Sequence, residues 1–140
     1  MPVWYYLRFS IYRIINQLNT KESTMKLITK EIKKQLEKNA AISENAHLMP
    51  EIKIDHKPVL KLFSPVGCAT WLLTELKDGI AFGLCDLGQG TPELGFVSIT
   101  ELENIKLAYG LKIERDLHFT ANKTLSEYAA SAKSNGGIVA

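Results

Sequence analysis

The dipeptide Asp78-Gly79 most constrains the fold of this chain, because it separates two apolar, strand-like segments that span 70–76 and 80–85. An Asp-Gly pair suits a two-residue hairpin turn, in which both central residues take positive φ. A turn of that length fixes which residues face each other across the hairpin: Leu73 with Leu84, Glu75 with Phe82, and Trp71 with Asp86.

Both faces of this predicted hairpin carry apolar side chains, because side chains alternate along a strand. One face presents Trp71, Leu73, Phe82 and Leu84, and the other presents Leu72, Leu76, Ala81, Gly83 and Cys85. A sheet that is apolar on both sides is expected to be covered on both sides, at least in part. A register shift of one residue would exchange the two sets.

The remaining segments predict more strands and three helices. Strand-like patterns also cover 59–63, 94–99 and 111–119. Helical patterns begin near the expected caps Thr29, Thr100 with Glu103, and Thr124 with Glu127. The first helix is expected to end near residue 40, before a loop over 41–58, and Gly110 to end the second. The expected fold class is α+β, an antiparallel β-meander of about four or five strands with flanking helices.

The length of 140 residues suits one domain, preceded by an N-terminal extension. Residues 1–24 are rich in aromatic and β-branched side chains, with Arg8 and Arg13 among them. They are expected to be either an amphipathic helix or the result of a mis-set translation start, because a polar linker and Met25 follow. Residues 25–133 form the expected single α+β domain, and 134–140 an expected frayed tail.

Composition excludes several classes of protein. The 17 basic and 15 acidic residues leave a formal charge of +2, too small to imply a polyanionic partner. The two cysteines, Cys68 and Cys85, are too few for a secreted disulfide framework and are interpreted as small buried residues. No run of roughly 18 apolar residues occurs, so no transmembrane segment is expected. We therefore expect a cytoplasmic protein.

The densest group of polar residues is Glu114-Arg115-Asp116-Leu117-His118. If 111–119 is a strand, then Glu114, Asp116 and His118 share one face. Two carboxylates and an imidazole could bind a divalent cation or carry out acid–base chemistry, with Arg115 holding an anion. The alternative is a structural network that ties the strand to its neighbours. Asp86 and Glu93 could join this cluster only if the fold brings them close.

Other candidate sites are weaker. No spacing groups the Cys and His residues as zinc ligands, and no phosphate-binding or dinucleotide motif occurs, so we expect no metal and no cofactor. Lys33 and Lys34 lie on the polar side of the first predicted helix, where a solvated face is the alternative to a nucleic-acid contact. Trp71 is a candidate binding residue, although Trp71, Phe82 and Phe96 are better interpreted as core residues, because no basic residue adjoins them.

From Met25 to about Tyr128 the chain resembles a small bacterial family that is catalogued only as a domain of unknown function. The stretches that carry the resemblance are 25–31, Thr70-Trp71, 82–86, 93–98, Glu101-Leu102 and 113–119. Members of the family are often encoded on plasmids, phages and integrating elements. The resemblance implies a cytoplasmic bacterial accessory protein, and it implies no particular activity.

The sequence thus favours a non-enzymatic binding or regulatory module, with a protein as the expected partner and a mobile genetic element as its setting. One alternative is a small metal-dependent hydrolase that uses Glu114, Arg115, Asp116 and His118. Another is a weak nucleic-acid binder that uses the lysine face of the first helix.

Overall fold

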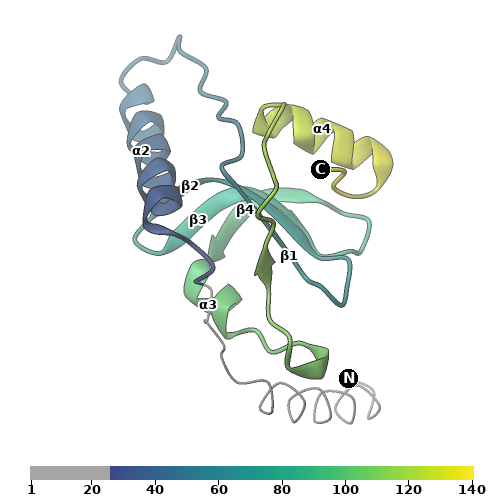
Figure 1. The fold of residues 1–140 in the computed structure, drawn as a ribbon. Coiled ribbons are helices and arrows are strands. Elements are labelled where there is room, and N and C mark those ends of the chain that lie inside the picture. Colours follow the sequence, from purple (N-terminus) through teal and green to yellow (C-terminus); the bar gives the residue numbers. More distant parts are fainter. Residues whose placement is uncertain (1–25) are drawn as a thin grey trace.

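The computed structural model describes residues 26–140, which form one antiparallel five-stranded sheet with helices on both faces (Figure 1). The strands are β1 (Leu60–Phe63), β2 (Thr70–Lys77), β3 (Ile80–Asp86), β4 (Glu93–Ser98) and β5 (Glu114–Arg115), in the order β4-β3-β2-β1-β5. The first four strands form a meander, and β5 pairs with β1 at the far edge. The expected α+β fold with an antiparallel meander is confirmed. The predicted extension over 1–24 lies outside the described residues.

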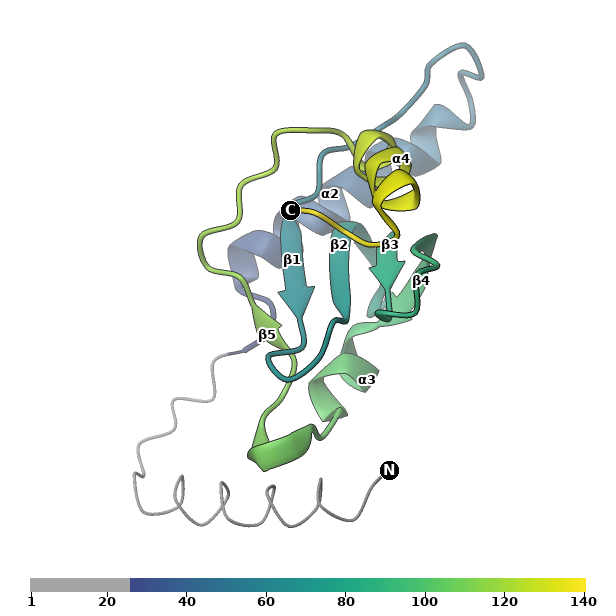
Figure 2. The same ribbon diagram turned by 90° about the vertical axis from the view of Figure 1, so that its right-hand side faces the viewer.

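Helices cover the two faces of the sheet. They are α2 (Lys30–Ala46), α3 (Ile99–Asn104) and α4 (Leu125–Asn135), with a 3-10 turn at Ala108–Gly110. Figure 2 shows α4 in front of the sheet and α2 behind it. This arrangement confirms that both faces of the sheet are covered. Among residues 26–140, no helix has the length and apolar character needed to cross a membrane.

The helix α2 begins where the sequence predicts, and it runs further. Thr29 accepts a hydrogen bond from the Ile32 N–H at 3.2 Å, which caps the first turn. The buried residues Leu36 and Ala40 pack on the sheet. The helix continues to Ala46 rather than ending near residue 40, because no Gly or Pro interrupts the chain before Pro50.

The β2–β3 hairpin has the predicted turn, but the predicted register holds only next to that turn. Asp78 and Gly79 have φ of 50° and 78°, as a two-residue turn with two positive φ values requires. Glu75 faces Phe82 as expected. Beyond it, the register shifts by one residue, because Thr74 is an extra residue in β2, a β-bulge. The observed pairs are Leu73 with Gly83 and Trp71 with Cys85, so the predicted pairs Leu73–Leu84 and Trp71–Asp86 are wrong.

The bulge also decides which side chains share a face. Trp71 and Leu73 lie with Leu76, Ala81 and Cys85, while Leu72 lies with Phe82 and Leu84 on the opposite face. Relative to β3, the β2 residues before the bulge therefore lie on the opposite face from the one predicted. The two strands approach closely at Gly83. A Cβ atom at this position would lie only 2.0 Å from the Leu72 carbonyl oxygen, so the approach requires glycine. The carbonyl of Thr74 accepts a hydrogen bond of 2.9 Å from the buried Asn39 side chain of α2.

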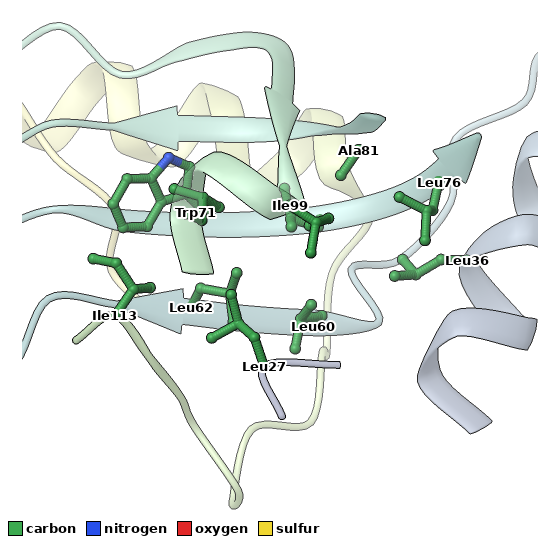
Figure 3. Close-up of a cluster of buried hydrophobic side chains, with 11 residues drawn as sticks. Leu27, Leu36, Leu60, Leu62, Trp71, Leu76, Ala81, Ile99 and Ile113 are labelled. Carbon is green, nitrogen blue, oxygen red and sulfur yellow. The ribbon is translucent and has the colours of Figure 1, made fainter. Parts of the chain in front are cut away.

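The core has two parts, one on each face of the sheet. The larger cluster lies on the face of the sheet that α2 and α3 cover (Figure 3). Its buried members are Leu27, Leu36, Leu60, Leu62, Trp71, Leu73, Leu76, Ala81, Ile99, Leu102 and Ile113. The smaller cluster lies under α4 and contains Leu72, Leu84, Leu125, Tyr128 and Ala132. Burial of this apolar area is the main stabilising contribution to the fold.

The structure after β4 differs from the sequence prediction. Ser98, not Thr100, caps α3, because its hydroxyl accepts from the Glu101 N–H, and α3 ends at Asn104. The strand predicted over 111–119 is reduced to Glu114–Arg115. The capping box of Thr124 and Glu127 is confirmed at the start of α4.

The C-terminal residues are attached to the sheet where fraying was expected. The Gly137 N–H donates to the Ala132 carbonyl at 3.0 Å and ends α4. The Ile138 N–H then donates to a side-chain oxygen of Asp86 at 2.9 Å, and Ile138 packs on the smaller cluster. Residues 137 and 138 are therefore held against the end of β3.

Candidate functional site

The cluster Glu114 to His118 does not form one face of a strand, because the chain turns at Asp116. The Asp116 N–H donates to the Lys61 carbonyl at 3.0 Å, which extends the β5 pairing by one bond. The Asp116 carboxylate then accepts a hydrogen bond of 2.9 Å from the His118 N–H, two residues ahead. Such a local bond favours a turn over a continuing strand. The prediction that Glu114, Asp116 and His118 share a strand face is therefore wrong.

Asp116 and Arg115 are both engaged in contacts within the fold. The hydrogen bond from the His118 backbone, followed by the Lys61 ammonium 3.4 Å away, holds the pKa of the Asp116 carboxyl below its usual value of 3.8. Arg115 donates through Nη1 to the carbonyls of Lys26 and Leu27, at 3.0 and 3.1 Å. It thereby attaches the segment before α2 to the β5 edge. These contacts match the structural network that the sequence left as an alternative.

A hollow of about 520 Å³ lies beside this turn, and its lining includes Lys61, Arg115, Asp116 and His118. Glu114 is exposed and is not part of the lining. The structure thus brings three of the four candidate residues together and leaves the fourth outside. Within residues 26–140, no three His, Cys, Asp or Glu side chains are placed to hold a metal ion together. The hollow offers mixed charge, with one carboxylate already paired with a lysine.

Neither Asp86 nor Glu93 lines this hollow. Asp86 is 5% exposed, and its two oxygens accept hydrogen bonds from Gly88 and Ile138, so it joins the turn after β3 to the C-terminal residues. Glu93 begins β4, which is the opposite edge of the sheet from β5 (Figure 2). Neither residue joins the 114–118 cluster.

The environments of Trp71, Lys33 and Lys34 match the alternatives to a binding role, which are a core residue for Trp71 and a solvated helix face for the two lysines. Trp71 is buried in the larger core cluster. Lys33 and Lys34 are exposed on α2, where Lys33 lies 3.8 Å from Glu37 of the next turn. Of the two cysteines, Cys85 packs against the core, and burial raises the pKa of its thiol. Cys68 is exposed, so its interpretation as a buried residue is wrong.

His56 makes a contact that the sequence did not indicate. Its Nε2 atom lies 3.1 Å from the Ser43 hydroxyl and 3.1 Å from the Asn39 carbonyl oxygen. A carbonyl oxygen can only accept a hydrogen bond, so Nε2 carries the proton that is shared with it. An Nε2 atom that carries a proton cannot remove one from Ser43. The pair therefore holds the loop before β1 against α2 instead of activating a nucleophile.

The most exposed aromatic side chain on the sheet is Phe96, which the sequence placed in the core. Phe96 is 75% exposed and its neighbour on the same face, Leu94, is 50% exposed. Phe96 faces Phe82 across the β3–β4 pair, with ring centroids 5.1 Å apart. It lies on the face that α4 covers, but the cluster under α4 includes Phe82 and neither Leu94 nor Phe96. The prediction that Phe96 is a core residue is wrong, because the local sequence does not indicate which part of the sheet α4 covers.

A second hollow, of about 460 Å³, adjoins this apolar surface. Its apolar lining includes Ile54, Phe82, Leu94 and Leu125, and Lys53, Asp55 and Glu75 supply charge. Ile54 and the nearby Ile52 are themselves partly exposed. We call Leu94, Phe96 and this adjoining hollow the β4 surface. It combines an apolar patch with a strand whose outer edge pairs with no other strand among residues 26–140.

The comparison with protein families decides what kind of chain this is. A family model described as "Protein of unknown function (DUF2958)" matches residues 27–139. The chain belongs to the DUF2958 family. This confirms the expected membership of a domain-of-unknown-function family. No curated protein and no solved structure matches the chain. The matched DUF2958 range includes both the 114–118 turn and the β4 surface.

Proposed function

We propose that this DUF2958 protein is a non-enzymatic binding module that takes up a protein partner by adding a strand at β4. The observation that carries the proposal is the exposure of Phe96, whose side chain is three-quarters exposed on an edge strand of six residues. Strand addition to an open sheet edge is a recurring mode of protein recognition, in which backbone bonds supply affinity and side-chain pockets supply specificity.

The two edges of the sheet support this choice. The β5 edge has only two residues, both charged, and its end is closed by the turn at Asp116. Short, charged edges are a common protection against unwanted pairing. The β4 edge is longer and carries one charged residue, Glu93, at its end. An apolar edge of that kind is typical of a surface that is covered by a partner.

The β4 surface also offers contacts for side chains. A strand that pairs with β4 would place every second side chain on the face that bears Leu94 and Phe96. The hollow of about 460 Å³ lies beside that row and is bounded by Leu94 and Phe82. An apolar residue of the partner could therefore be buried there, next to the Phe82–Phe96 ring pair.

The proposed setting is the cytoplasm of a bacterium, where the protein serves a mobile genetic element. The resemblance of the sequence to a bacterial family that is often encoded on such elements supports this setting. No observation favours the hydrolase alternative, because Asp116 and Arg115 are engaged in contacts within the fold. None favours the nucleic-acid alternative, because Lys33 has an acidic neighbour at 3.8 Å.

A peptide selection tests the binding function. The full chain would be immobilised and exposed to a random-peptide phage library, and selected peptides would be measured by calorimetry. We expect enriched peptides with alternating apolar residues. The variant Phe96→Lys should weaken their binding by at least about tenfold, or about 1.4 kcal/mol, because a charge replaces the central aromatic contact.

The matched control is Leu117→Lys, which places the same charge on an exposed apolar residue after β5. Binding of the selected peptides should be unchanged in this variant. Circular dichroism of both variants confirms that the fold is intact. If a chain that is monomeric by light scattering enriches no peptide, or if selected peptides bind Phe96→Lys and Leu117→Lys equally well, the proposed function is wrong.

A further inference from the structure

We propose that the strand added at β4 comes from a second copy of this chain, so that two β4 strands pair antiparallel about a two-fold axis at Gly95. This inference rests on the proposed function and names the partner at the same surface. It is carried by the backbone geometry, the side-chain pattern and the charge of β4.

The backbone of β4 is oriented for such pairing. The Ile99 N–H, directly after the strand, donates to the Gly79 carbonyl at 3.0 Å, across the β3–β4 pair. Backbone groups alternate in direction along an antiparallel strand. Gly95 and Val97 therefore direct their N–H and C=O groups towards β3, and Leu94 and Phe96 direct theirs to the open edge.

The sequence of β4 is self-complementary in one register. With Gly95 facing Gly95 of a second copy, the Leu94 of each chain lies opposite the Phe96 of the other, which gives two such pairs. An isologous dimer requires this kind of self-match, in which one surface complements itself. Pairs of an aromatic and an aliphatic residue across antiparallel strands are stabilising. A Cβ on Gly95 meets no atom within 4 Å in the single chain, so the fold itself leaves this position open.

The charges permit the pairing. In this register Glu93 lies opposite Val97 of the other copy, and the two Glu93 residues lie four positions apart, about 13 Å along the strands. That separation exceeds the screening length of about 8 Å at physiological ionic strength. The formal charge of +2 per chain adds little repulsion between copies.

The point where the chain enters the described fold lies at the opposite edge of the sheet from β4. Arg115 of β5 holds the carbonyl of Lys26, so the described chain begins at the β5 edge. The β4 strand is the opposite edge, four inter-strand spacings away, or about 19 Å. A second copy can present its own β4 directly, without crossing the sheet.

A cysteine at the axis tests the proposal in the full chain. The background is Cys68→Ser with Cys85→Ala, into which Gly95→Cys is introduced. In a narrow, non-hydrogen-bonded pair the two Cα atoms lie about 4.5 Å apart, which a disulfide can bridge. We expect a disulfide-linked dimer on a non-reducing gel after mild oxidation, and a dimeric mass for the unmodified chain by light scattering. Thr91→Cys, exposed just before β4, is the control that should not cross-link.

Three results would overturn the inference. One is a monomeric mass at every concentration with no cross-link at residue 95. Another is a dimer in which Thr91→Cys cross-links as readily as Gly95→Cys. The third is a dimer that cross-links through Phe96→Cys instead, which indicates a different register. If the chain is monomeric and selected peptides still lose affinity in Phe96→Lys, then strand addition at β4 stands and only the identity of the partner is wrong.

Discussion

Asp116 stabilises the turn after β5 most strongly while its carboxyl group is ionised. The His118 N–H and the Lys61 ammonium, at 2.9 and 3.4 Å, favour the ionised form and hold the pKa below 3.8. A carboxyl group whose pKa is lowered by folding contributes its stability above the unfolded value. That contribution is lost as the pH falls through the folded value.

The corresponding prediction concerns Asp116→Asn. We expect the free energy of unfolding of wild type to exceed that of the variant by a constant amount above about pH 5. The difference should shrink as the pH falls below 3.8, because protonated Asp116 loses the pairing with Lys61. Urea unfolding at a series of pH values measures it. Glu114→Gln, at the exposed neighbouring carboxylate, is the control, and a difference that persists unchanged in acid would contradict the prediction.

At the scale of the elements, the β2 bulge and the helix α2 stabilise each other. The extra residue Thr74 points its carbonyl away from the sheet ladder, and Asn39 of α2 donates to it at 2.9 Å in a buried position. Gln35 in turn donates to the Asn39 side chain at 3.0 Å, which fixes its orientation. A buried carbonyl without a hydrogen-bond donor lowers the free energy of unfolding. The fold is therefore most stable when α2 lies where Asn39 can reach the Thr74 carbonyl.

Asn39→Ala is therefore expected to lower the free energy of unfolding by about 1–3 kcal/mol, because it leaves the Thr74 carbonyl buried and unpaired. Lys38→Ala, an exposed neighbour on the same helix, should change it by less than about 0.5 kcal/mol. Urea unfolding of both variants at neutral pH measures the difference. Equal stabilities of the two variants would show that the helix does not depend on this bond.

At the scale of the whole molecule, local patterns predicted the fold class and long-range packing decided the site. The Asp78-Gly79 turn, the Thr29 cap and the Thr124–Glu127 capping box all depend on neighbours in sequence, and all are confirmed. The β2 bulge depends on how closely Gly83 lets two strands approach. The sequence contains that glycine but no signal of its role.

The candidate site was less predictable for the same reason. Alternation along an assumed strand placed Glu114, Asp116 and His118 together, but a side-chain hydrogen bond at Asp116 ends that strand. Phe96 has the pattern of a core residue, and its exposure depends on the extent of α4, an element about thirty residues later in the chain. Residues whose environment is set by distant elements cannot be assigned from local pattern alone.

The inequality of the two sheet edges has a consequence for the size of any assembly. A chain with two open edges could add copies without end and grow into a fibre. The sheet formed by residues 26–140 has one extended open edge, at β4, while β5 is short and charged. Pairing of two β4 strands would therefore use the extended edge of each chain. The assembly would end as a dimer with one continuous ten-stranded sheet that has a β5 strand at each outer end. We expect the mass measured by light scattering to stop at two chains as concentration rises, and a continued increase would contradict this closure.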